Sequence, residues 1–361
     1  MAMTIQHVRL ERIKRPLKRP FITSLQEVTE RESIIVTVQD SEGRSGYGEC
    51  VAFSTPWYTE ETITSCQFVL EHVLIPLVEG KQLNEPRQVA DWFGAVKGNR
   101  MAKAALESAI WDLAAKCAGK SLAEFVGGTK DTVAAGTVVA VAHTEAAAVD
   151  EAANAGYRRI KVKIRPSDEM NVFKQIISTY PEVLFFADAN GAFEHEPFER
   201  LLEWDEAGFY LIEQPFSEES WELHRRASAQ MQTKICLDES LRSFEDAKRM
   251  VREAAGTVAV LKMGRLGGWA ETLRIVDYLK AHGVQMWVGG MIEFGVSKAH
   301  NLALASIAGV DLPGDLTASN HYWEADIIEP EISVRGGEVT VSNTLGIGYN
   351  VVLEEEDEQC S

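Results

Sequence analysis

Five charged residues lie at nearly equal intervals in the second half of the sequence, each at or just after the end of a short apolar run. They are Lys163, Asp188, Glu213, Asp238 and Lys262, and their separations are 25, 25, 25 and 24 residues. One strand–helix unit of a parallel barrel has about this length, because roughly 200–250 residues make eight units. The spacing predicts that all five lie at equivalent depth on the C-terminal rim of a barrel, where barrel enzymes carry their chemistry.

Three of these residues are carboxylates that end adjacent predicted strands, and their charges would repel one another strongly unless a cation lay between them. Asp188, Glu213 and Asp238 are hard oxygen donors, which favours Mg²⁺, or Mn²⁺, over Zn²⁺. Any one of them alone would more simply begin a polar loop or cap the next helix. The regular interval of all three favours a metal site.

Lysines lie on both sides of these carboxylates. Lys161 and Lys163 are two residues apart, so their side chains share one face of the predicted strand, and the apolar residues at 160, 162 and 164 take the other face. This arrangement directs two ammonium groups into the barrel interior, which is costly without counter-ions or a function. An edge strand with two solvated lysines is the alternative, and the regular alternation around it disfavours that alternative. Lys262 would face this pair across the barrel mouth.

A divalent cation between lysines is suited to removing a proton alpha to a carboxylate in a small-molecule substrate. That proton is weakly acidic, and the enediolate that forms needs concentrated positive charge. A metal bound to the substrate carboxylate supplies such charge as a Lewis acid. A lysine that acts as the base must be neutral, and neighbouring cations favour its neutral form.

The elements that would position these residues begin near residue 133, where short apolar runs alternate with amphipathic stretches. Eight strand–helix units would make a closed parallel barrel. An open doubly wound sheet is the alternative, but neither GxGxxG nor GxxxxGK[ST] occurs in the chain. The predicted strands are 138–141, 160–164, 183–187, 209–212, 235–237, 258–261, 284–288 and, less clearly, 307–312. The predicted helices between them include 170–179, 197–206, 244–254 and 270–282.

The N-terminal part has a different pattern. Its first 55 residues are rich in β-branched residues and turn signals, which predicts strands. Residues 15–21 contain two prolines and no periodicity, which predicts a loop. The pattern turns helical over 59–77 and 101–117, where Leu106, Ile110, Leu113 and Cys117 fall on one helical face.

Composition bounds the class of protein. The chain has 361 residues, 45% of them hydrophobic, and a formal net charge of −18. It is therefore globular rather than disordered, and the negative balance argues against nucleic acid and anionic membranes as partners. No apolar run suggests a transmembrane helix or signal peptide. The five cysteines, without a CxxC pair, predict reduced thiols in a cytoplasmic protein. The acidic run at 354–358 is interpreted as a solvated terminus.

At these residues the chain resembles the muconate-lactonizing subgroup of the enolase superfamily, and it is most similar to the o-succinylbenzoate synthase / N-succinylamino acid racemase family. The resemblance implies a modified TIM (β/α) barrel, residues 131–324, with an α+β capping domain formed by residues 1–130 and the returning C-terminal segment 325–361. The motifs that carry it are Lys161-Val-Lys163, Asp188-Ala-Asn190, Glu213-Gln-Pro215, Asp238-Glu-Ser240, Gly46-Tyr-Gly-Glu-Cys50, Lys262-Met-Gly-Arg-Leu-Gly-Gly268, Gly289-Gly-Met-Ile-Glu293 and Leu312-Pro-Gly-Asp315.

The resemblance also implies roles for particular residues. Asp188, Glu213 and Asp238 would bind Mg²⁺. Lys163 would remove the alpha proton of a cyclohexadiene carboxylate and help its hydroxyl leave as water, giving o-succinylbenzoate for menaquinone synthesis, and Lys262 would stabilise the enediolate.

Further roles concern the surroundings of the two lysines. Lys161 would hold the substrate carboxylate and favour the neutral form of the base. Arg265 would tune Lys262, or would simply bond loop carbonyls. Gly290 and Met291 would border the substrate, and Phe21 would close over it.

Two residues depart from the family pattern. Phe294 stands where a small Ser or Thr is expected, and Ser297 where Gly is expected. Both follow the seventh predicted strand, so they bear on the shape of the pocket rather than on the metal chemistry.

The motifs leave several functions open. Racemization of N-succinylamino acids shares the enediolate step with the synthase reaction, and the family has members that perform both. A catalytically silent metal-binding or assembly protein is disfavoured by the retained lysines. A barrel metal hydrolase would normally use His ligands, and none of the eight histidines lies at the predicted strand ends. Barrels of this kind often form homo-oligomers, which we expect here.

Overall fold

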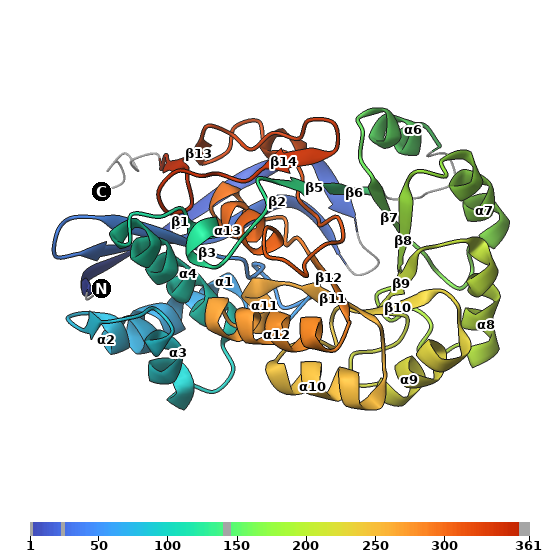
Figure 1. Ribbon diagram of the computed structural model, residues 1–361, viewed down its shortest axis with the longest axis horizontal. Coiled ribbons are helices and arrows are strands. Elements are labelled where there is room, and N and C mark those ends of the chain that lie inside the picture. Colours follow the sequence, from blue (N-terminus) through green and yellow to red (C-terminus); the bar gives the residue numbers. More distant parts are fainter. Residues whose placement is uncertain (1–2, 23–25, 140–145, 354–361) are drawn as a thin grey trace.

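The computed structural model describes residues 3–22, 26–139 and 146–353, and it contains two main sheets (Figure 1). The N-terminal sheet has four antiparallel strands in the order β3-β2-β1-β4. Its strands are β1 (Met3–Ile22), β2 (Glu27–Asp40), β3 (Ser45–Cys50) and β4 (Gln82–Leu83). The expected β structure of the first 55 residues is therefore present.

The loop predicted for residues 15–21 is wrong, because strand β1 continues to Ile22. The pairing of β1 with β2 is interrupted between Pro16 and Phe21, and Lys18 N instead donates to Tyr322 O at 2.9 Å. This part of β1 lies at the edge of the sheet, where a proline without an N–H group is tolerated. The two prolines therefore mark an irregularity in an edge strand rather than a loop.

Helices of the N-terminal part cover one face of this sheet. Both predicted helical stretches are confirmed, although the first is divided by a π-helical turn at Leu70–Leu74. Glycine at positions 46 and 48 allows α4 to pack closely against β3. A Cβ at Gly48 would overlap the carbonyl oxygen of Ala105. The helices are α1 (Ile63–Val69), α2 (Ile75–Val78), α3 (Gln88–Trp92), α4 (Arg100–Cys117) and α5 (Leu122–Phe125).

The second sheet contains seven parallel strands in sequence order, β6 to β12, with helices on its outer side (Figure 1). The strands are β6 (Gly136–Val139), β7 (Arg159–Lys163), β8 (Leu184–Asp188), β9 (Leu211–Glu213), β10 (Lys234–Leu237), β11 (Val258–Leu261) and β12 (Gln285–Val288). The helices are α6 (Ala146–Asn154), α7 (Met170–Thr179), α8 (Phe198–Glu203), α9 (Trp221–Gln230), α10 (Phe244–Glu253), α11 (Met263–Leu266), α12 (Trp269–Ala281) and α13 (Gly295–Ala305). The predicted alternation is confirmed over these seven strands.

The eighth predicted strand, at 307–312, is not formed among the described residues. Irregular chain follows α13 instead, and Leu312 N and Asp315 N donate to Met286 O and Val288 O of β12. On the other side, Gly136 N of β6 donates to Gly314 O at 2.7 Å. Residues 312–315 therefore bridge the two edge strands and occupy the eighth position of a modified barrel, in which Pro313 and Gly314 prevent a regular strand.

Side chains alternate across the barrel wall with the period of two that strands impose. One buried cluster, formed by Phe186, Leu211, Cys236, Val258, Val260 and Trp287, is separate from the main core. Each of four strands carries one of these residues two positions before a charged residue of the predicted site, as Phe186 precedes Asp188 and Val260 precedes Lys262. The cluster thus forms an apolar floor beneath the charged side chains.

The C-terminal segment returns to the N-terminal elements. Strand β14 (Glu338–Thr340) pairs with β5 (Thr132–Ala134), and β13 (Ile328–Glu329) pairs with β15 (Asn350–Val351). Ile347 N donates to Asp112 Oδ1 of α4 at 2.7 Å. The domain boundaries at 130 and 324 stay predictions, and the acidic run at 354–358 lies outside the described residues.

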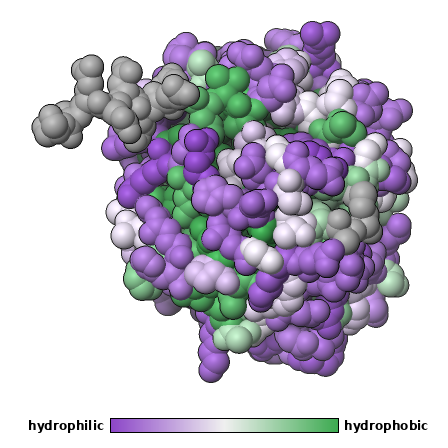
Figure 2. All heavy atoms as spheres, turned by 90° about the vertical axis from the view of Figure 1, so that its left-hand side faces the viewer, coloured by the Kyte–Doolittle hydropathy of each residue, from purple (hydrophilic) through white to green (hydrophobic). Residues whose placement is uncertain are grey.

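Several expectations from composition can be compared with the structure. Cys50, Cys66, Cys117 and Cys236 are buried and free, as predicted, and Cys360 lies outside the described residues. No helix in the described ranges is long and apolar enough to cross a membrane. Figure 2 shows a band of hydrophobic residues between hydrophilic ones on the face at the left of Figure 1. Homo-oligomer formation stays a prediction.

We predict that Gly48→Ala destabilises the protein, because the added methyl group would force α4 away from β3. Overpacking of this kind costs about 1–3 kcal/mol, so the melting temperature should fall measurably in a calorimetric scan. Gly94→Ala is the control, since a Cβ at Gly94 has no atom within 4 Å and the backbone there does not have a positive φ. Equal melting temperatures for Gly48→Ala and wild type would contradict the close packing of α4.

Candidate active site

A cavity of about 260 Å³ lies at the C-terminal ends of the barrel strands, facing the N-terminal elements. It brings together most of the residues singled out from the sequence. Its lining includes Phe21, Lys161, Lys163, Asp188, Asp238, Lys262, Gly290 and Met291. Glu213 is fully buried beside Lys161, and Arg265 is buried behind Lys262, so neither is part of the cavity lining.

The depth of the charged residues follows the register of the strands. Lys163 pairs with Asp188, and Asp188 with Glu213, so these three are level. Glu213, however, pairs with Cys236, which places Asp238 two residues further along its strand. Strands of a closed barrel are tilted and staggered, so equal spacing in sequence does not give an equal register all round. The strand register therefore agrees with the expected equal depth for Lys163, Asp188 and Glu213. Asp238 lies two residues further along its strand.

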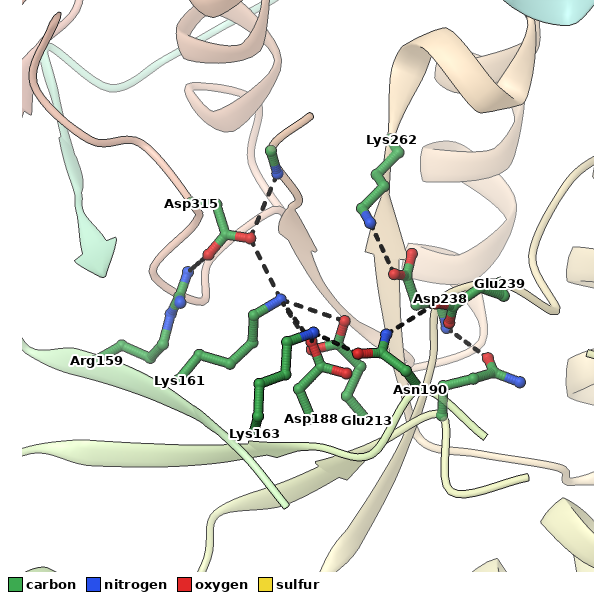
Figure 3. Close-up of polar contacts among 12 residues, drawn as sticks. Arg159, Lys161, Lys163, Asp188, Asn190, Glu213, Asp238, Glu239, Lys262 and Asp315 are labelled. Atoms are coloured by element: carbon green, nitrogen blue, oxygen red, sulfur yellow. Dashed lines mark hydrogen bonds and ion pairs between the residues drawn. The ribbon is translucent and has the colours of Figure 1, made fainter. Parts of the chain in front are cut away.

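The ammonium group of Lys161 lies among three carboxylates at the centre of the site (Figure 3). Its Nζ is 3.3 Å from Asp188 Oδ2, 3.3 Å from Glu213 Oε2 and 3.4 Å from Asp315 Oδ2. Burial alone would lower the pKa of Lys161, but the charges of Asp315, Glu213 and Asp188 outweigh it and raise that pKa well above its ordinary value. The carboxylates therefore favour the charged form of Lys161, and its charge offsets the repulsion between them.

Lys163 is more exposed than Lys161 and reaches the cavity. Its Nζ donates to Asp188 Oδ2 at 2.6 Å and also to Asn190 Oδ1. Asn190 Nδ2 in turn donates to Glu239 Oε1 at 3.0 Å, so the contacts of Lys163 continue into the loop after β10 (Figure 3).

Lys262 lies in the opposite wall with its own set of partners. Its Nζ donates to Asp238 Oδ2 at 2.8 Å and to the Tyr58 hydroxyl at 2.7 Å. Arg265 Nη1 also donates to this hydroxyl. Burial would lower the pKa of Lys262, but the Asp238 charge outweighs it and raises that pKa. Burial also raises the pKa of Tyr58, to about 12, so its hydroxyl stays protonated.

Arg265 contacts the backbone and the side chain of Asp238. Its Nη2 donates to the Asp238 backbone carbonyl at 2.6 Å and lies 2.7 Å from Asp238 Oδ1. Because the hydrogen bond goes to the carbonyl, Asp238 Oδ1 takes part in the ion pair without accepting a hydrogen bond. Arg265 therefore bonds a loop carbonyl, and it shares the Asp238 carboxylate with Lys262.

The donor chemistry of the site fits a hard divalent cation. Asp188 Oδ1, Glu213 Oε2 and Asp238 Oδ1 are buried and accept no hydrogen bond, and leaving a buried acceptor unsatisfied is costly. Burial and the charge of Asp188 raise the pKa of Glu213 well above its ordinary value, as repulsion between carboxylates requires. Among the described residues, no three Asp, Glu, His or Cys side chains yet surround one point as metal ligands would. The acids are paired with lysines, and their oxygens are of the type that a hard divalent cation prefers.

The structure adds residues to which sequence reasoning gave no role. Asn190, Glu239 and Asp315 lie inside motifs that were recognised. The signal was position: Asn190 and Glu239 lie two residues after a strand end, and Asp315 is the last residue of the closing segment 312–315. Arg159 Nη2 is 2.7 Å from Asp315 Oδ1, and this inward arginine precedes Lys161 by two residues. Tyr58 gave no signal, because only the tertiary fold brings it to Lys262.

The two departures from the family pattern lie outside the cavity lining formed by the described residues. Phe294 is fully buried and stacks on Trp323, with ring centroids 4.1 Å apart. Phe294 N and Ser297 N, at the start of α13, donate to the two oxygens of Glu49 on β3, at 2.9 and 2.8 Å. These residues therefore join the loop after β12 to the N-terminal sheet.

Comparisons with family models cover most of the chain. The model described as "Enolase C-terminal domain-like" matches residues 144–356. The model described as "Mandelate racemase / muconate lactonizing enzyme, N-terminal domain" matches residues 5–127.

Individual relatives are similar over nearly the full length. The o-succinylbenzoate synthase of Geobacillus stearothermophilus is 42% identical over 354 residues, which cover 97% of this chain and 94% of that protein. The N-succinylamino acid racemase of Thermus thermophilus is 36% identical over 354 residues, covering 97% and 96%. A solved structure of an enolase superfamily member from Listeria innocua has a TM-score of 0.94 at 35% identity, covering 97% of this chain and 95% of that chain.

The buried Glu49 predicts a pH-dependent contribution to stability. Burial raises the pKa of Glu49 to about 8, so the unfolded chain releases this proton at lower pH than the folded protein does. The contribution is most favourable below about pH 4.5 and declines as the pH rises towards 8. The free energy of unfolding of wild type relative to Glu49→Gln should therefore fall by a few kcal/mol between pH 5 and pH 8, measured by urea denaturation. The exposed variant Glu60→Gln should show no such trend, and a pH-independent difference for Glu49→Gln would refute the assignment.

Proposed function

The chain belongs to the o-succinylbenzoate synthase / N-succinylamino acid racemase family of the enolase superfamily, and from this we propose that it is a Mg²⁺-dependent o-succinylbenzoate synthase. It would be a carbon–oxygen lyase that dehydrates 2-succinyl-6-hydroxy-2,4-cyclohexadiene-1-carboxylate to o-succinylbenzoate, as menaquinone biosynthesis requires. A cytoplasmic location and a homo-oligomeric state accompany this proposal as predictions.

One observation carries the proposal: two lysines reach the same cavity from opposite walls, with three carboxylates on the strands between them. Lys163 ends β7, and Lys262 directly follows β11. With residues 312–315 in the eighth position, β7 and β11 are four positions apart in a ring of eight and face each other. A planar enediolate between them would have an ammonium or amine group on each face.

Asp188, Glu213 and Asp238 would hold Mg²⁺ through oxygens that include the three without hydrogen bonds. When bound, Mg²⁺ supplies Lewis-acid charge that makes the alpha proton of the substrate carboxylate more acidic. Lys161, whose ammonium group lies among the carboxylates, would hold the substrate carboxylate in place. The donor chemistry and burial of these side chains support the proposed roles.

Lys163 would perform the proton transfers. As the base it would act in its neutral amine form. Its Nζ would take the alpha proton, and the resulting ammonium would return a proton to the departing 6-hydroxyl, so that water and o-succinylbenzoate leave and Lys163 is neutral again. Lys262, held as a cation by Asp238, would stabilise the enediolate with its charge. Gly290 and Met291 would border the substrate.

Racemization of N-succinylamino acids is the second candidate, possible in the same site. The placement of Lys163 and Lys262 on opposite walls is what favours it, because racemization needs a proton removed on one face and returned on the other. Both reactions share the enediolate step, so one set of residues would serve both.

We expect the purified protein with Mg²⁺ to form o-succinylbenzoate from the cyclohexadiene substrate, followed spectroscopically, and EDTA to abolish this activity until Mg²⁺ is restored. Lys163→Ala should lower kcat by at least about 10³-fold, because general acid–base catalysis contributes roughly 10²–10⁴-fold at one group and this lysine acts twice. Lys174→Ala, which changes an exposed lysine on α7, is the control. Normal turnover by Lys163→Ala, or full activity in EDTA, would disprove the mechanism.

For the racemase reaction, we expect deuterium to enter the alpha position of N-succinyl amino acids in D₂O, measured by NMR. Lys163→Ala and Lys262→Ala should each slow exchange from a different enantiomer, because the two lysines face opposite sides of the alpha carbon. Absence of exchange in wild type would exclude this activity. The ratio of kcat/KM for the two substrates would then rank the functions.

A further inference from the structure

The contact between Lys163 and Asn190 depends on the orientation of the asparagine amide. Oδ1 faces the lysine Nζ as an acceptor, whereas the opposite orientation would place an NH₂ group against an ammonium group. Among the described residues, Lys163 Nζ has one further carboxylate or amide partner, which is the carboxylate of Asp188. Whatever fixes the Asn190 amide therefore also fixes one of the two contacts that hold Lys163.

Glu239 fixes that amide. Asn190 Nδ2 can only donate, and it donates to Glu239 Oε1 at 3.0 Å. The Asn190 oxygen is thereby left facing Lys163 (Figure 3). Glu239 itself is partly buried, and both Glu239 and Asn190 line the cavity.

The backbone at Asn190 supports the same arrangement. Its φ is 43°, in the left-handed region that asparagine adopts more readily than most residues. This conformation turns the chain sharply two residues after Asp188. A strained turn of this kind persists where surrounding contacts hold it, and such turns cluster at functional sites.

We propose that Glu239 and Asn190 act together as positioning residues that hold Lys163 in the geometry for proton transfer. The proposal rests on the proposed function, in which Lys163 is the base. Asn190 contacts Lys163 from the loop after β8, and Glu239 holds Asn190 from the loop after β10. The counterpart in the opposite wall is Tyr58, which contacts Lys262 and not Lys163. Each lysine therefore has its own positioning group.

The first test compares two substitutions of Glu239. Glu239→Ala removes the acceptor and frees the Asn190 amide, and kcat for the synthase reaction should fall about 10–100-fold with little change in KM, since a misplacement of about 1 Å can cost 10²-fold. Glu239→Gln should retain kcat within about fivefold, because its oxygen can still accept from Asn190 Nδ2. Its new NH₂ group would replace Glu239 Oε2, which accepts no hydrogen bond among the described residues.

The matched control is Glu219→Ala, which removes an exposed carboxylate on the loop after β9 that pairs with Arg242. It should leave kcat unchanged. An equal loss of kcat in Glu239→Ala and Glu239→Gln would overturn the proposal, because charge rather than orientation would then be responsible. Unchanged kcat in Glu239→Ala would overturn it as well.

A second readout separates positioning of Lys163 from a general structural effect. In D₂O exchange, Glu239→Ala should slow the enantiomer that Lys163→Ala slows and spare the other. Tyr58→Phe, which removes a hydroxyl from Lys262, should slow the opposite enantiomer. Equal slowing of both enantiomers by Glu239→Ala would indicate a merely structural role and refute the proposal.

Crystal structures of wild type and Glu239→Ala make the proposal testable independently of turnover. The separation of Lys163 Nζ from Asn190 should increase in the variant, and an unchanged contact would refute the proposal. If wild type neither forms o-succinylbenzoate nor exchanges alpha protons, the proposed function fails, while the separation of these two residues still decides whether Glu239 positions Lys163.

Discussion

The structure of the site depends on keeping several carboxylates buried next to one another inside a barrel. Asp188, Glu213 and Asp315 share the ammonium group of Lys161, which lies within 3.4 Å of an oxygen of each. Buried charges are tolerated only when they are paired, so removal of one partner leaves the others uncompensated. Lys161 therefore contributes to the folded barrel as well as to the proposed chemistry.

The barrel supplies this arrangement through strand alternation and closure. An apolar floor that includes Phe186 and Trp287 lies below the charged residues and separates them from the other end of the barrel. The irregular segment 312–315 completes the ring and brings Asp315 to Lys161. Charge pairing at the mouth thus requires both the regular strands and the irregular eighth position.

The N-terminal elements are attached to the barrel by buried glutamates that accept backbone N–H groups at helix starts. Glu49 on β3 accepts hydrogen bonds from Phe294 N and Ser297 N at the start of α13. Glu107 on α4 accepts one from Ala270 N of α12 at 2.7 Å. Carboxyl oxygens are suitable acceptors at helix N-termini, where backbone N–H groups have no partner within the helix. Since α12 and α13 follow the loops after β11 and β12, these contacts connect the N-terminal sheet to two walls of the cavity.

The sequence by itself determined the strand ends, because alternation with period two and the length of one strand–helix unit are local properties of the chain. It thereby identified Lys161, Lys163, Asp188, Glu213, Asp238 and Lys262 as neighbours. It failed at residues 15–21 and 307–312, where pairing with distant segments decides whether irregular chain becomes a strand. Only the tertiary structure decided that Asp238 is staggered, that Tyr58 contacts Lys262 and that Glu239 orients Asn190. These contacts join residues 49 to 204 positions apart, and their geometry depends on barrel closure and on packing between sheets, which no local pattern encodes.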